Sequence, residues 1–157
     1  MADRLTLDTN LIREWLDEDS RVETVQQLLR LKDAGKVDLA VTARIHEDIW
    51  FPPLSDRLAE LAEVGIAETG SVARLGFWQL GRDHLGDSEF VDWVESLNVK
   101  EPDWRDFDHL HAHMLQNRDF FLTWDSKILH FRVDLSTLWR IEVQRPEEYL
   151  EHRFGVS

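Results

Sequence analysis

Short strand-like runs alternate with helical patterns along this chain, and that alternation constrains the fold more than any other feature. Apolar and β-branched residues are concentrated in four runs that we predict to be strands: 4–7, 37–41, 120–124 and 138–143. Apolar residues at helical spacing lie around these runs, over 11–17, 20–35, 45–49, 54–64, 88–97, 106–115, 126–131 and from Pro146 onward. Strands separated by helices predict an α/β fold, with a three-layer α/β/α arrangement around a central, mostly parallel sheet. At 157 residues, a single domain over 1–157 is expected.

Capping residues predict where several of these elements begin and end. Asn10 and Ser20 are expected to be the N-caps of the first two helices. Gly35 is expected to end the second helix in a left-handed conformation. Five glycines between Gly65 and Asp87 predict a loop-rich excursion that could hold a short strand, and 98–103 is read as a connection.

Composition excludes several classes of function. There is no cysteine, so disulfides, thiolate metal sites and a cysteine nucleophile are ruled out. The net charge of −13, from 31 acids and 18 bases, argues against indiscriminate binding to polyanions. The N-terminus carries no basic-then-apolar signal and no apolar run approaches 18 residues, which predicts a soluble, cytoplasmic protein without a membrane partner.

Three aspartates occupy positions where a carboxylate suggests chemistry. Asp8 and Asp125 each follow a predicted strand directly, where α/β folds collect ligand-binding groups. At 100° per residue, Asp106 lies near Leu110 on the buried face of its helix, whereas Asp108 points almost the opposite way. A carboxylate on a buried face is costly unless a cation or a hydrogen bond compensates it.

These residues stand in segments that resemble the PIN-domain nucleases. The helix start Asp106-Phe107-Asp108-His109-Leu110, the strand Asp119-Phe120-Phe121-Leu122-Thr123-Trp124-Asp125 and the opening Leu5-Thr6-Leu7-Asp8-Thr9-Asn10 are similar to three motifs of that family and fall in its order. The resemblance spans roughly the whole chain.

The resemblance implies an Mg²⁺- or Mn²⁺-dependent ribonuclease, a hydrolase of RNA phosphodiester bonds like the VapC-type toxins. It implies metal binding and catalysis by Asp8, Asp106, Asp125 and a fourth acid on the helix after the second strand. Glu47 matches many members in residue type, whereas Asp48 flanks the apolar Ile45/Ile49 stripe, so both stay candidates. The partners it implies are RNA, an antitoxin protein if the chain is the toxin of a toxin–antitoxin pair, and a second copy in a homodimer. Carboxylate-held dications suit this chemistry because they neutralise the phosphate and activate water.

Other residues are candidates for supporting roles. Asn10, Thr123 and His109 could orient ligands or metal-bound water from behind the carboxylates. His109 and His113, at i and i+4, form a possible zinc pair, although buried histidines more often make ordinary hydrogen bonds. Trp124 could stack on a base, and Asp119 is read as structural. Candidate phosphate contacts are Arg44, Arg118, Arg132 and Arg140.

Ordinary structural roles compete with each assignment. Asp8 and Asp125 could be helix N-caps, and Asp106 a first-turn acid that favours the helix dipole. A catalytically inactive PIN module that binds RNA or protein is the alternative function. An aspartate-based phosphatase is disfavoured, because Asn10 stands where such enzymes need a second aspartate, and no phosphate-binding glycine loop occurs.

Overall fold

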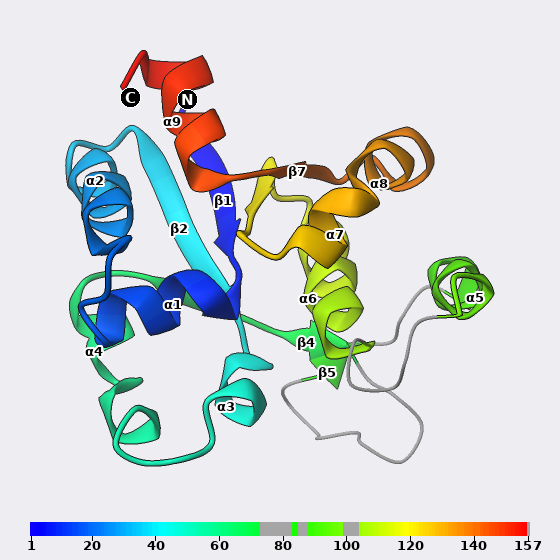
Figure 1. Cartoon of the computed structure of the whole chain (residues 1–157), viewed down its shortest axis with the longest axis horizontal. Helices are drawn as coiled ribbons and strands as arrows, with labels where there is room; N and C mark the ends of the chain where they lie inside the picture. The colour runs from blue at the N-terminus through cyan, green and yellow to red at the C-terminus, as the bar shows by residue number, and fades with distance from the viewer. Residues whose placement is uncertain (73–82, 85–87, 99–103, 157) are drawn as a thin grey trace.

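A five-stranded, all-parallel sheet forms the centre of the protein in the computed structural model, which describes residues 1–72, 83–84, 88–98 and 104–156. The strand order is β3-β2-β1-β6-β7 (Figure 1). The strands are β1 (Asp3–Leu7), β2 (Val37–Thr42), β3 (Ala67–Thr69), β6 (Phe120–Leu122) and β7 (Glu142–Gln144). The prediction of an α/β fold with a parallel sheet is therefore confirmed.

Helices precede or follow these strands along the chain. They are α1 (Thr9–Leu16), α2 (Val22–Asp33), α3 (Ile45–Asp48), the 3₁₀ helix η1 (Ser55–Arg57), α4 (Glu60–Glu63), α5 (Ser88–Ser96), α6 (Trp104–Leu115), α7 (Ser126–His130), α8 (Arg132–Trp139) and α9 (Pro146–Phe154). A second, two-stranded parallel sheet pairs β4 (Ser71–Val72) with β5 (Asp83–His84). No helix within the described ranges combines the length and apolar character needed to cross a bilayer.

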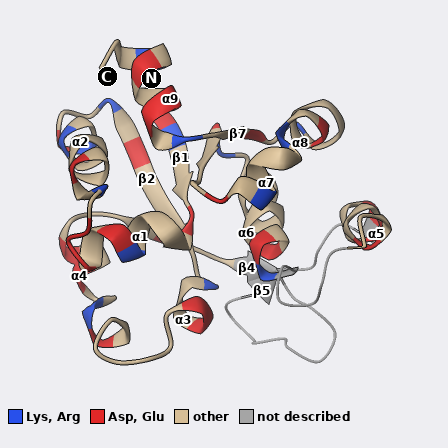
Figure 2. Ribbon diagram, viewed as in Figure 1, with Lys and Arg blue, Asp and Glu red and all other residues tan. Residues whose placement is uncertain are grey.

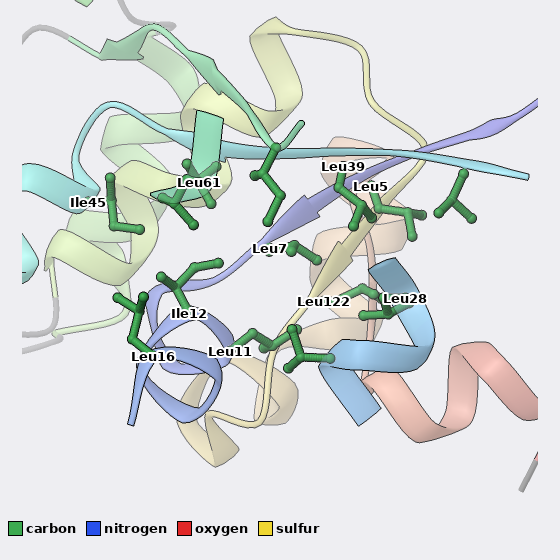
Figure 3. Close-up of a cluster of buried hydrophobic side chains, with 14 of the residues drawn as sticks. Leu5, Leu7, Leu11, Ile12, Leu16, Leu28, Leu39, Ile45, Leu61 and Leu122 are labelled. Carbon is green, nitrogen blue, oxygen red and sulfur yellow. The ribbon is translucent and has the colours of Figure 1, made fainter. Parts of the chain in front are cut away.

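Helices cover both faces of the central sheet, and alternate strand residues point to one face or the other. Leu5 and Leu7 of β1 are buried in a cluster with α1, α2 and α9 (Figure 3). Thr6, between them, points to the other side, where its hydroxyl lies 2.8 Å from Nδ1 of His113 on α6. A second apolar cluster on that side joins Phe121 of β6 to side chains of α5, α6, α7 and α8. Figure 1 shows the same division, with α1 and α2 on one side of the sheet and α6, α7 and α8 on the other.

Most predicted strands and helices are present, but several boundaries were wrong. Asp8, not Asn10, is the N-cap of α1, and Asn10 lies inside the helix. The N-cap of α2 is Arg21, without a side-chain bond, so Ser20 is not the cap. Gly35 has φ +67°, as expected for a left-handed helix end.

Two longer segments also differ from prediction. The region 54–64 is not one amphipathic helix but the short pieces η1 and α4. The predicted strand 138–143 was placed too early, because α8 continues to Trp139 and β7 starts only at Glu142. The expected excursion after Gly65 contains β3, β4 and β5. The predictions for 73–82, 85–87 and the connection 99–103 lie outside the described residues.

The strand order creates a crevice at one end of the sheet. From β1 the chain passes outward to β2 and β3, and later returns to the other side of β1 as β6 and β7. β1 and β6 are neighbours in register, with Leu7 opposite Leu122. In doubly wound sheets ligands bind beyond the carboxyl ends of the strands at such a reversal point. Asp8 and Asp125 flank this point, one after each strand.

Candidate functional site

A cleft of about 270 Å³ opens beyond the carboxyl ends of β1 and β6, and we call it the carboxylate cleft. It is lined by Asp8, Thr9, Asn10, Arg13, Asp48, Arg105, Asp106 and Asp125. Its four aspartates come from the start of α1, the end of α3, the first turn of α6 and the start of α7. Figure 1 shows α1, α3 and the beginning of α6 gathered at this end of the sheet. Acids far apart in the sequence therefore share one cavity.

Asp8 is held by hydrogen bonds to both of its carboxylate oxygens. Oδ1 accepts from the backbone N–H of Thr9 at 2.8 Å, which makes Asp8 the N-cap of α1. Oδ2 accepts from the hydroxyl of Thr123 at 2.6 Å. The residue is only 4% exposed. Asp8 therefore caps α1 and also lines the cleft.

Thr123 connects the two sides of the crevice. Its buried hydroxyl donates to Asp8 and accepts from Nδ2 of Asn10 at 3.1 Å and from the backbone N–H of Asp125 at 2.9 Å. Asp125 in turn caps α7, with Oδ1 accepting from the backbone N–H of Lys127 at 2.8 Å. Thr123 thus contacts the carboxylate of Asp8 directly and Asn10 contacts Thr123, whereas a role of either residue in orienting metal ligands stays a prediction.

Of the two acids left open on α3, Asp48 lines the cleft and Glu47 does not. Oδ2 of Asp48 accepts from the hydroxyl of Thr9 at 2.7 Å and lies 2.6 Å from Nε2 of His109. Glu47 instead lies 3.0 Å from the guanidinium of Arg44. Because successive helical residues point about 100° apart, only one of the pair can face the cleft.

His109 links α6 to Asp48 and to the sheet. Its ring is 2% exposed, and Nδ1 lies 2.5 Å from the hydroxyl of Thr42 at the end of β2. A carboxylate only accepts hydrogen bonds, so Nε2 is protonated and donates to Asp48. Burial alone would lower the pKa of His109, but the hydrogen bond and charge of Asp48 raise it above its ordinary value. His109 thus fixes the direction of the Asp48 carboxylate.

The rings of His109 and His113, the possible zinc pair, do not point toward a common metal position. His109 is engaged by Asp48 and Thr42, whereas Nδ1 of His113 lies against Thr6 on β1. Within the described ranges, no group of three or more His, Asp or Glu side chains is arranged to hold a metal ion as it stands.

The pKa values of three aspartates in the cleft are shifted from their ordinary values. Burial, followed by the charges of Asp8 and Asp125, raises the pKa of Asp106 to about 7. Burial also raises the pKa of Asp8, although His109 and the hydrogen bond from Thr123 act in the opposite direction. The pKa of Asp48 is lowered, because the bond and charge of His109 outweigh its burial. Negative charge in the cleft is therefore only partly compensated by the protein.

The donor set fits a hard dication such as Mg²⁺ or Mn²⁺. The cleft offers oxygen ligands only, and its carboxylates repel one another, a cost that a cation would relieve. Oδ1 of Asn10 is buried and has no hydrogen-bond partner among the described residues. Each oxygen of Asp8 accepts one hydrogen bond and has a second lone pair that can contact a cation. Mg²⁺ keeps several waters and needs only one or two carboxylates, which suits this arrangement.

Two arginines in the cleft were not singled out from the sequence. Arg13, on α1, donates to the backbone oxygen of Asp48 at 2.6 Å, and Arg105 lies in the first turn of α6. The charge of Arg105 also helps to lower the pKa of Asp48. Each lies within one helical turn of a predicted site residue, Asn10 or Asp106. This proximity in the sequence could have indicated them.

The arginines that were predicted to contact phosphate lie elsewhere. Arg44 is buried against Glu47 and Asp108. Arg118 binds the backbone oxygen of Leu5 and the carboxylate of Asp38. Arg132 pairs with Glu148, and Arg140 forms the left-handed end of α8. None of these four residues lines the carboxylate cleft.

Asp108, Asp119 and Trp124 also have clear positions. Asp108 is buried beside Arg44, on the side of α6 away from Asp106. Asp119 accepts from the backbone N–H of Arg4 at 2.7 Å, the structural role expected of it. Trp124 donates to Glu147 at 2.9 Å and has the guanidinium of Arg21 over its ring, so the described contacts use the indole N–H and one face of the ring.

Comparisons with protein-family models, with curated proteins and with solved structures each give no match.

Proposed function

We propose that the protein is a divalent-metal-dependent ribonuclease with a PIN-like fold. The observation that carries this proposal is the meeting of Asp8, Asp48, Asp106 and Asp125 in one cleft at the reversal point of a parallel sheet. Helix capping is enough to explain the positions of Asp8 and Asp125. It does not explain why Asp106 lies close to both of them, where burial and their negative charges raise its pKa to about 7. A site that receives a dication explains this proximity.

Mg²⁺ or Mn²⁺ would be held by these four aspartates, directly or through water. When bound, the ion supplies charge neutralisation for the phosphodiester and lowers the pKa of water. Asp48 takes the fourth place left open between it and Glu47, because only Asp48 lines the cleft.

The other residues of the cleft position these ligands and the substrate. Thr123 and the backbone of Thr9 hold the carboxylate of Asp8, and His109 holds that of Asp48. Arg13 and Arg105 place positive charge at the mouth of an otherwise acidic cavity, where a phosphate must approach. Asp106 must lose its proton before a cation binds, and its pKa of about 7 allows this near neutral pH.

The PIN-like assignment rests on the order of elements together with the residues. Asp8 follows the first strand, Asp48 ends the helix after the second strand, Asp106 starts the helix before β6, and Asp125 follows β6. The PIN-family motifs that this sequence resembles occur in the same order along the chain. A toxin role, an antitoxin partner and a homodimer are extensions of the same proposal.

Replacing Asp8 by Asn tests the catalytic role. Asn keeps an oxygen for the N-cap and the size of the side chain but removes the charge and the acceptor for the hydroxyl of Thr123. Mn²⁺-dependent RNA cleavage is therefore expected to fall about 100-fold or more, while the protein stays folded with a thermal midpoint within a few degrees of the wild type. Cleavage is followed on a labelled RNA by gel electrophoresis, with EDTA as a blank. Asp134→Asn, an exposed position on α8, is the matched control and should retain full activity. A fully active Asp8→Asn protein would rule the mechanism out.

A catalytically inactive module that binds RNA or protein is the second candidate. The observation that favours it is the net charge of −13, because a strongly acidic protein repels the phosphates of an RNA substrate. Stabilisation by Mn²⁺ separates the two candidates, because only a metal site predicts it.

A further inference from the structure

A second, larger pocket lies beside the carboxylate cleft. Its volume is about 340 Å³, at the small end of the ~300–1,000 Å³ typical of ligand pockets. It is lined by Asp106, Phe107, Ser126, Lys127, Ile128, His130 and Phe131. Asp106 lines both cavities, so the two adjoin at this residue. A molecule that reaches the carboxylate cleft can therefore extend into this pocket.

The walls of this pocket are apolar and its rim is polar. Phe107 and Ile128 are buried, and Phe131 is half-buried with its ring centroid 5.9 Å from that of Phe107. His130 is exposed and meets Phe131 edge-on, with 5.0 Å between ring centroids. Ser126 and Lys127, also exposed, add a hydroxyl and an ammonium group. Such a combination suits a flat aromatic ligand that has polar groups along its edge.

We propose that this pocket binds a nucleobase next to the phosphodiester that lies in the carboxylate cleft. This inference rests on the proposed nuclease function and names how its substrate is held. A base can enter the pocket only when it is unpaired, because a base inside a duplex is stacked and hydrogen-bonded. The substrate strand is therefore single-stranded at this position.

The charge of the protein supports a base contact as a main source of affinity. The net charge is −13, and Figure 2 shows acidic positions on helices of both sides of the sheet. Proteins that bind nucleic acid through phosphate contacts depend on clustered Lys and Arg. Here the positive residues that line the carboxylate cleft are Arg13 and Arg105, with Lys127 in the second pocket. Stacking on aromatic side chains does not need a basic surface.

Two variants change the pocket without touching the carboxylate cleft. His130→Ala removes an aromatic ring from the rim, and Ser126→Trp fills the opening from an exposed position. His152→Ala, an exposed histidine on α9, is the matched control. Binding is measured by fluorescence anisotropy of a labelled single-stranded RNA hexamer in Ca²⁺, with the strand verified intact on a gel. Both pocket variants are expected to bind at least about fivefold more weakly than the wild type, as loss of one stacking contact predicts, and the control is expected to bind equally.

A strand with one abasic nucleotide tests the same contact from the ligand side. Removing the base that occupies the pocket should weaken wild-type binding about as much as Ser126→Trp does, and should not weaken Ser126→Trp further. Equal affinity of wild type and both pocket variants for the intact hexamer would overturn the inference, as would a wild type that binds no hexamer.

Cleavage in Mn²⁺ of an abasic phosphodiester strand, which has sugars and phosphates but no aromatic ring, separates this inference from the proposed function. Because this diester places no ring in the pocket, His130→Ala and Ser126→Trp should cleave it at the wild-type rate. A wild type that does not hydrolyse the diester but loses hexamer affinity in both variants would refute the nuclease proposal and keep the base pocket. The reverse result would keep the nuclease and refute the pocket.

Discussion

Thr123 is the residue on which the geometry of the carboxylate cleft depends most. Its single hydroxyl donates to Asp8 and accepts from Asn10 and from the backbone of Asp125. It therefore sets the distance between the chain segments that leave β1 and β6. The short bond to Asp8 stabilises the charged carboxylate and opposes the rise in its pKa that burial causes.

Asp106 should make stability depend on pH. Its pKa is about 7 in the folded protein, above the value of about 3.9 in an unfolded chain. The folded state therefore holds the proton over this interval, and stability falls as pH rises from about 4 to about 7 and then levels off. Asp106→Asn should remove this loss, on the order of 2 kcal/mol after allowance for solvent screening.

Urea unfolding in EDTA at pH 5 and pH 8 measures this difference. For each protein we take the change in unfolding free energy between pH 5 and pH 8. The quantity compared is this change in the wild type minus the same change in Asp106→Asn. His113, whose pKa burial lowers to about 3, has the opposite trend at acid pH but contributes equally to both proteins and cancels. Asp134→Asn should follow the wild type. Parallel profiles for wild type and Asp106→Asn would show that Asp106 is not crowded by the other carboxylates.

At the scale of the elements, α8 is the helix that the sequence did not reveal. Its apolar residues do not mark one face: Val133 is 70% exposed and Leu138 57% exposed, whereas Leu135 is buried. The strong β-formers that follow Leu138 favoured a strand instead. Arg140, with φ 56°, ends the helix and turns the chain into β7. Burial against α5, α6 and α7, which a local pattern cannot express, decides the helical conformation.

Paired alanine substitutions in α8 test this placement. Leu135→Ala removes a fully buried side chain and should lower the unfolding free energy by about 2–5 kcal/mol. Leu138→Ala, one turn later and exposed, should change it by less than about 0.5 kcal/mol. Chemical denaturation of both variants gives the values. A cost at Leu138 as large as that at Leu135 would contradict the position of α8.

For the whole molecule, the two ends of the chain are joined. Asp3, at the start of β1, accepts from the hydroxyl of Tyr149 at 2.9 Å and from the guanidinium of Arg153 at 2.8 Å, both on α9. Figure 1 shows the two termini side by side. Since β1 lies in the middle of the sheet and leads directly into Asp8, this contact anchors the strand that carries the first acid of the cleft.

Binding of Mn²⁺ should stabilise the whole fold. At 100 times the dissociation constant a ligand of the folded state adds about 2.7 kcal/mol, which for a chain of this size raises the thermal midpoint by about 5–10 °C. EDTA should reverse the shift, and Asp8→Asn should reduce it, whereas Asp134→Asn should not. Differential scanning calorimetry provides the midpoints. An unchanged wild-type midpoint together with intact RNA binding would identify the inactive binding module.

Local sequence patterns determined the kind and order of most elements, the parallel character of the sheet, and the positions of Asp8 and Asp125 beyond strand ends. Such patterns report which residues are buried and where the backbone turns. They do not report the angle at which helices pack, which decides what each side chain meets. Only the tertiary structure therefore placed Asp48 rather than Glu47 in the cleft, added Arg13 and Arg105, and formed the second pocket between α6 and α7. Each of these features depends on contacts between residues distant in the sequence, and those contacts exist only once the layers have packed.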